Sequence, residues 1–293
     1  MKKIVTFILL LCMALSFSAC ADKKSTPPEI TLQEIYDASK VVNLLKDSDS
    51  VYVEHSGNGV VYLSDYFTKD CTYSLYEMEE TYSEFLITDH SYFHMSSDKT
   101  PVRLVPLTPS GAVDMTHFLA KEGEINIFST ELLNDTITSV KEKNGQIIVT
   151  SVVDQDELAS IEGLLSYEEE LVLDAKTRKP ISTKTVLRFE NEVFEEKTTF
   201  TYDAEAPERM KIFEEYDNKT DNLRTVTVIS NPGTKDEKTD IIRAPKGLVV
   251  GLTVDTQYSD RTFTTYNDAA CTQVFDGEPN VNSDITVYIK WNE

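Results

Sequence analysis

Cys20 is the side chain whose neighbours most clearly indicate a chemical step. It follows Phe17-Ser18-Ala19 at the end of an apolar run that begins after Lys2 and Lys3. The run Ile4–Phe17 holds about 14 residues, fewer than the roughly 20 that cross a bilayer as a helix, so it suits the apolar part of a cleaved signal peptide. The position of the thiol behind small residues predicts a site of lipid attachment.

The segment Phe17-Ser18-Ala19-Cys20 resembles the lipobox of bacterial lipoproteins, with Phe17 where Leu is usual. The resemblance implies a signal peptide over 1–19, a diacylglyceryl and palmitate-type membrane anchor on Cys20, and a place on the outer face of the membrane, as in a Gram-positive bacterium. The alternative is ordinary cleavage near Ala19 with an unmodified Cys20. Residues 20–28 are polar and end in two prolines, which suits a tether.

Other reactive side chains do not form a recognisable metal or catalytic site. His90 and His94 are four apart, but Ser91-Tyr92-Phe93 is typical of a strand, where that spacing spans about 13 Å and excludes a shared ion. The run Asp217–Asn222 departs from a calcium loop at several ligand positions. Hydrolase and phosphate-loop motifs are absent from the sequence. We therefore expect a non-enzyme without a cofactor or metal.

Charge restricts the partners. The formal net charge is −22, and removal of Lys2 and Lys3 with the signal would bring it to −24. Such a chain repels nucleic acid, so nucleic-acid binding is excluded. Paired carboxylates could still serve an envelope hydrolase, but fifty acids offer no basis for choosing a pair. We expect Glu168-Glu169-Glu170 to lie on a solvated strand edge.

The elements that would position these groups are mostly strands. Thr31-Leu32-Gln33-Glu34 is a capping box, and the apolar spacing after it predicts a helix from about 31 to 47. Short β-branched and aromatic runs follow, and Lys143-Asn144-Gly145 predicts a tight hairpin. A helical turn is expected at 114–119, a short strand at 125–128 and a short helix at 156–165. Strands are expected near 51–53, 60–63, 72–76, 84–88, 91–95, 102–105, 137–141, 146–153, 170–174, 180–189 and 193–202.

One helix followed by a long antiparallel sheet resembles the LolA/LolB lipoprotein-carrier superfamily. The resemblance is carried by the helix 31–46 and the hairpin 171–181, and it covers residues 29–216. It implies an α+β, mostly β fold with the helix packed on a curved half-barrel sheet around a hydrophobic or lipid ligand. The aromatic residues of the strands are ordinarily core. If a cavity exists, its strand residues are expected to be Leu171, Leu173, Leu187, Phe189, Phe200 and Tyr202.

The C-terminal segment resembles a different family. Residues 217–222 lack an apolar side chain and suggest a linker. The ending Asp284-Ile285-Thr286-Val287-Tyr288-Ile289-Lys290-Trp291 of residues 223–293 resembles the Listeria-Bacteroides repeat, the internalin B-repeat type of small β-grasp-like module. Trp291, the only Trp, is expected to fill this module's core. Cys71 and Cys271 are expected to remain two separate, partly buried thiols.

Three functions remain open from the sequence. The first is an anchored, non-catalytic protein that binds a hydrophobic or lipid ligand in the curved sheet. The second is a cell-surface interaction or adhesion scaffold that binds a wall polymer or a protein. The third is the carboxylate-based envelope hydrolase.

Overall fold

The computed structural model describes residues 30–88, 92–97, 101–108, 110–111, 119, 125–127, 137–153, 163–217, 223–254, 261–275 and 281–292, without the side chains of 214–217. Cys20 and the tether lie outside these residues, as does the helical turn expected at 114–119 apart from Leu119. Within the described part, no helix is both long and apolar enough to cross a membrane. The expectation of a mostly β chain with few helices is confirmed.

The first helix begins where the capping box predicts. Glu34 donates its backbone N–H to Thr31 Oγ1 at 3.2 Å, and the Thr31 N–H donates to the Glu34 carboxylate at 2.7 Å. The prediction of one helix to residue 47 is wrong, because Lys40 is extended and forms an isolated bridge with Asn126. The neighbouring N–H of Val41 donates to the carbonyl of Ile125. Three short helices result: α1 (Leu32–Ser39), α2 (Val41–Leu44) and the 3-10 helix η1 (Leu45–Asp47).

Twelve strands form one large open sheet in the order β14-β6-β5-β4-β3-β2-β1-β11-β10-β9-β8-β7. All neighbours are antiparallel except β14 and β6, which are parallel. The strands are β1 (Val51–Gly57), β2 (Val60–Phe67), β3 (Cys71–Met78), β4 (Thr81–Thr88), β5 (Tyr92–Met95), β6 (Pro101–Leu107), β7 (Ile137–Lys143), β8 (Gln146–Val153), β9 (Leu164–Asp174), β10 (Pro180–Phe189), β11 (Val193–Tyr202) and β14 (Val249–Val254).

Three sequence predictions about the strands and their connections have different outcomes. The tight hairpin is confirmed, since Asn144 and Gly145 both have positive φ (55° and 75°) between β7 and β8. The helix expected at 156–165 is wrong at its end, where Leu164 already pairs with Phe189 in the ladder between β9 and β10; residues 154–162 lie outside the description. The strand expected at 125–128 amounts, in its described residues, to the bridge at Asn126.

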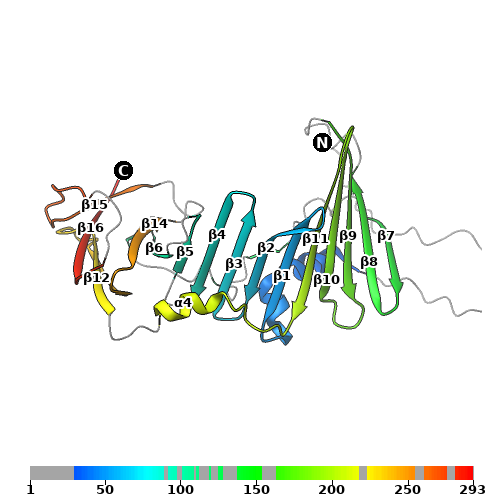
Figure 1. The fold of residues 1–293 in the computed structure, drawn as a ribbon, viewed down its shortest axis with the longest axis horizontal. Helices are drawn as coiled ribbons and strands as arrows, with labels where there is room; N and C mark the ends of the chain where they lie inside the picture. Colours follow the sequence, from blue (N-terminus) through cyan, green and yellow to red (C-terminus); the bar gives the residue numbers. More distant parts are fainter. Residues whose placement is uncertain are drawn as a thin grey trace, which may run out of the picture.

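Different helices accompany the two faces of the sheet. Figure 1 shows α1 and α2 behind β1 and its neighbours, and α4 (Met210–Asp217) in front of β3 and β4. On the α4 side, Met210 and Phe213 lie in one buried cluster with Tyr73 and Phe93. We call the face on the side of α1 and α2 the helix-side face.

The C-terminal residues contribute to two sheets. A four-stranded sheet has the order β13-β12-β16-β15, formed by β12 (Leu223–Ser230), β13 (Lys238–Pro245), β15 (Phe263–Tyr266) and β16 (Ile285–Trp291). By contrast, β14 belongs to the large sheet, and Val105 and Leu107 of β6 share a buried cluster with Trp291. Trp291 is 7% exposed, which confirms its expected place in a core. The linker at 217–222 lies mostly outside the described residues and stays a prediction.

Candidate functional site

The helix-side face contains all six residues expected to line a cavity, but it places them in different surroundings. Leu171 and Leu173 are fully buried in a cluster with Ile35 and Ala38 of α1. Phe200 is buried with Val41, Leu44 and Leu45. The end of this face near η1 is therefore filled by the protein's own helices.

The opposite end of the same face, near the β10–β11 turn, is less covered. Leu187 and Phe189 are only partly buried and pack against Val153 and Leu164 together with Tyr167. Strand pairing places Phe194, Leu187, Tyr167 and Val153 side by side across β11, β10, β9 and β8. We call these four residues the apolar row.

The apolar row continues onto the first strands through Gly57. A Cβ added at Gly57 would lie 3.2 Å from the Phe194 ring and 3.7 Å from the Tyr62 ring, so the glycine lets both rings come close together over β1. The Tyr62 ring lies 6.2 Å from that of Tyr76 in an edge-to-face arrangement. An extended, half-buried surface of aromatic and aliphatic groups results.

A second row lies two residues further along each strand, on the same face, and it is polar. Pairing aligns Ser151, Glu169, Thr185 and Glu196 across β8 to β11, and we call these four the polar row. Glu169 is 4% exposed. Burial of a carboxylate costs free energy unless hydrogen bonds or charges compensate, so its place next to the apolar row requires an explanation.

Tyrosine hydroxyls form hydrogen bonds with both acids of the polar row. Burial raises the pKa of the Glu169 carboxyl to about 7, and the hydrogen bond from Tyr167 offsets part of this rise. Burial, followed by the charge of Glu169, raises the pKa of Tyr167 to about 12. On β11, Glu196 accepts a hydrogen bond from Tyr62, whose pKa is raised by burial and by that carboxylate.

A histidine lies beside this row. His55 Nδ1 is 3.0 Å from Thr198 Oγ1, and His55 Nε2 is 3.5 Å from Asp65 Oδ2. This order of hydroxyl, imidazole and carboxylate resembles a nucleophile relay in composition. However, Thr198 is 4% exposed on an interior strand, so its hydroxyl is not presented to a substrate. The arrangement can fix polar side chains and offer hydrogen bonds.

The expectation of a solvated edge at Glu168-Glu169-Glu170 is wrong at Glu169. Strand β9 is interior, and alternation turns Glu169 to the same face as Tyr167, Leu171 and Leu173. The alternation of apolar residues at 167, 171 and 173 was visible in the sequence, but three adjacent acids give no contrast between the two faces of the strand. The contributions of His55, Asp65 and Tyr62 depend on strand pairing and had no sequence signal.

Another buried acid lies on the α4 side of the sheet. Glu84 is fully buried and accepts hydrogen bonds from Tyr73, at 2.6 Å, and from Tyr82. Arg209 Nη2 lies 3.5 Å from the same carboxylate and 2.6 Å from the Tyr82 hydroxyl. Because Met210 of α4 follows Arg209 directly, this network fixes α4 to the sheet.

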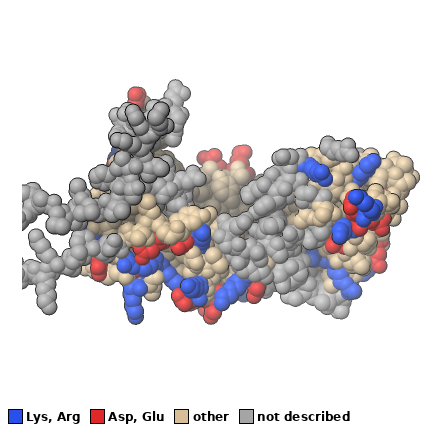
Figure 2. Space-filling view, turned by 180° about the vertical axis from the view of Figure 1, so that it is seen from behind, with Lys and Arg blue, Asp and Glu red and all other residues tan. Residues whose placement is uncertain are grey.

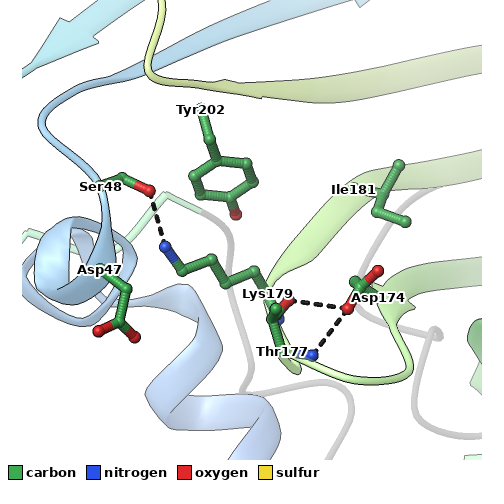
Figure 3. A pocket seen from close by; sticks show the side chains of 7 residues that line it. All are labelled: Asp47, Ser48, Asp174, Thr177, Lys179, Ile181 and Tyr202. Carbon is green, nitrogen blue, oxygen red and sulfur yellow. Dashed lines mark hydrogen bonds between the residues drawn. The ribbon is translucent and has the colours of Figure 1, made fainter.

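A separate pocket of about 360 Å³ opens at the η1 end of the helix-side face. Tyr202, the last of the six predicted residues, lines it together with Lys179 and Ile181. Figure 3 shows the Lys179 side chain extending under the Tyr202 ring toward Ser48.

Metal ligation finds no support in the described residues. They contain no group of three or more His, Cys, Asp or Glu placed to hold an ion. His94 lies on β5, with Nε2 3.1 Å from Ser83 Oγ, whereas His90 lies outside the description. No disulfide joins Cys71 and Cys271, and both side chains are partly buried.

Comparisons with known proteins give little further information. No family model matches the sequence, and no curated protein does. Among solved structures, the chain is similar to a LolA superfamily protein from Nitrosomonas europaea, with 10% sequence identity and a TM-score of 0.22. The match covers 62% of this chain and 97% of the other. A TM-score this low establishes neither a common function nor a common ligand.

Proposed function

We propose that this chain is a non-catalytic binding protein that holds a hydrophobic or lipid ligand on the helix-side face. The observation that supports this most directly is the half-buried apolar row beside the polar row, at the end of the face that α1 and α2 do not fill. An apolar ligand surface gains free energy when it leaves water against such a row. The filled end would act as a rigid base.

The ligand's polar end would meet the polar row. Carboxylates and phenols there accept hydrogen bonds, and the described lysines of β10 and β11, Lys184 and Lys197, belong to the opposite face of the sheet by strand alternation. A ligand with an apolar body and a hydrogen-bond-donating head therefore fits better than an anionic one.

We also infer the finer features of fold and location from the sequence. The large sheet with α1 and α2 would be a LolA-like half-barrel, and the four-stranded sheet a β-grasp-like module of the internalin B-repeat type. Cys20 would carry the lipid anchor on the outer side of the membrane. Metabolic labelling with palmitate should then mark the full-length protein but not a Cys20→Ser variant, and equal labelling of both would refute the anchor.

Ligand binding is tested with Leu187→Glu, which puts a charge into the apolar row. Uptake of a fluorescent monoacylglycerol probe, whose uncharged head donates hydrogen bonds, should fall by about tenfold or more, since one unpaired charge against an apolar ligand costs at least the 1.4 kcal/mol of a tenfold change. The matched control is Val186→Glu, one residue away on the opposite face of the same strand. Equal uptake by both variants, or no uptake by the parent protein, would contradict the proposal. Mass spectrometry of lipid co-purified with the parent protein provides an independent measurement.

A further inference from the structure

The pocket at the η1 end is a second concave site, separated from the apolar row by the filled part of the helix-side face. Its walls come from three places in the chain: the end of η1, the β9–β10 turn and the end of β11. The residues are Asp47, Ser48, Asp174, Thr177, Lys179, Ile181 and Tyr202. A volume of about 360 Å³ suits a small molecule and is too limited for a long acyl chain.

One wall of this pocket offers a positive charge and a hydroxyl together. Lys179 Nζ donates to Ser48 Oγ at 2.7 Å and lies 4.8 Å from the centre of the Tyr202 ring. No carboxylate of the described residues lies within ion-pair distance of this ammonium. The ammonium has three donors, so it can donate to a ligand while it keeps Ser48, whose own O–H is free to do the same. This pair suits a carboxylate.

The other wall carries negative charge. Asp174 Oδ1 accepts from the backbone N–H groups of Lys176 and Thr177 and from the Thr177 hydroxyl. These bonds from Thr177 lower the pKa of Asp174, so the carboxylate stays ionised, and no described donor contacts Oδ2. Asp47 adds a second acid, which lies beside Ser48 on the side of the pocket away from Asp174, as Figure 3 shows.

The positive and negative groups of the pocket together indicate the class of ligand that fits it. A simple anion would be attracted by Lys179 but repelled by Asp47 and Asp174. A simple cation would be attracted by the two acids but repelled by Lys179. A compact zwitterion satisfies both walls, and Ile181 with the Tyr202 ring would receive a small apolar side chain. In the view of Figure 2, described basic and acidic residues likewise lie next to one another along the lower edge.

From this geometry we infer that the pocket binds the ammonium-carboxylate group of an α-amino acid. The carboxylate would accept from Lys179 and Ser48, and the ammonium would donate to Asp174 Oδ2 on the other side. This site does not depend on the hydrophobic ligand proposed above, because the two places share no lining residue.

The test uses leucine and glycine as probes, with acetate and methylammonium as half-ligands, on the full chain without its signal. Nuclear magnetic resonance titration should show residues of the β9–β10 turn shifting with both amino acids. Each half-ligand should bind at least about tenfold more weakly, because it lacks one charge-assisted contact. Acetate or methylammonium binding as tightly as leucine, or no shift with leucine, would overturn the inference.

Variants identify the residues. Lys179→Met keeps the apolar stem and should weaken leucine binding by about tenfold or more, and Ser48→Ala should weaken it less. Lys176→Met is the control, since Lys176 is exposed in the same turn and does not line the pocket. Thermal unfolding of each variant separates lost binding from lost folding. Unchanged leucine binding in folded Lys179→Met, or equal loss in Lys176→Met, would refute the assignment.

Discussion

At the scale of single residues, Glu169 is the most informative side chain of the helix-side face. It is a buried carboxyl in a β-rich core, with Tyr167 as its hydrogen-bonding partner. Natural cores seldom bury an acid without a use for it, because the charged form loses hydration. Its place beside the half-buried apolar row associates it with ligand binding.

The Glu169→Gln substitution tests this burial through pH. The folded pKa of about 7 lies above the ordinary value of 4.5, so the folded state binds the proton more tightly than the unfolded state. The free energy of unfolding of the parent protein should therefore fall as pH rises from about 4.5 to 7. Glutamine removes this dependence, and the variant should gain up to about 3 kcal/mol over the parent at pH 8, with little gain at pH 5. Urea unfolding at the two pH values measures the difference.

Glu170→Gln is the control for that measurement, because Glu170 is the exposed neighbour on the other face of β9. Because Glu169 is unchanged in this variant, its stability relative to the parent should be the same at both pH values. A Glu169→Gln variant whose stability follows that of the parent at both pH values would show that Glu169 is not the buried acid described.

At the scale of elements, α4 is held to the sheet by the charged contacts of Arg209 and by an aromatic contact. Arg209 precedes the helix and reaches the fully buried Glu84, while Phe213 packs against Phe93 with ring centres 6.0 Å apart. The arginine is 41% exposed and the carboxylate keeps two phenolic donors. Its contribution is therefore smaller than that of a fully buried ion pair.

Arg209→Met should lower the free energy of unfolding by about 1–3 kcal/mol, because it leaves Glu84 buried with only hydroxyl partners. Hydrogen exchange should rise in residues 204–213 before it rises in β3 and β4. Lys211→Met, which changes an exposed lysine on the same helix, should leave both quantities unchanged. Equal exchange in the two variants would show that the arginine does not hold α4 in place.

At the scale of the whole molecule, the large sheet and the C-terminal residues have a common core. β14 pairs with β6, and Val250 of β14 is fully buried in the cluster that contains Val105 and Trp291. A further contact joins the two parts, since Ser230 donates to the carbonyl of Gly111 at 3.0 Å. A Cβ on Gly111 would lie 2.2 Å from that of Ser230, so this approach requires glycine.

The Val250→Asp substitution tests whether this core is held in common. An unpaired charge there should cost about 3 kcal/mol or more and shift the unfolding of both parts together. Trp291 fluorescence reports the C-terminal part, and circular dichroism reports the large sheet. Ile241→Asp is the control, because Ile241 is 69% exposed on β13. Loss of the Trp291 signal alone, with an unchanged transition of the large sheet, would indicate two independent cores.

The sequence by itself determined the local features of this protein. The capping box at Thr31 and the Asn144-Gly145 hairpin depend on neighbouring residues, whose chemistry is legible along the chain. Tertiary structure decided what depends on partners distant in sequence. It interrupted the helix at Lys40 by pairing with Asn126, made β9 an interior strand, and drew β14 into the large sheet. The same long-range pairing brought His55 beside Thr198 and Lys179 beside Ser48, because hydrogen bonding between strands and across a pocket is set by register and packing rather than by local propensity.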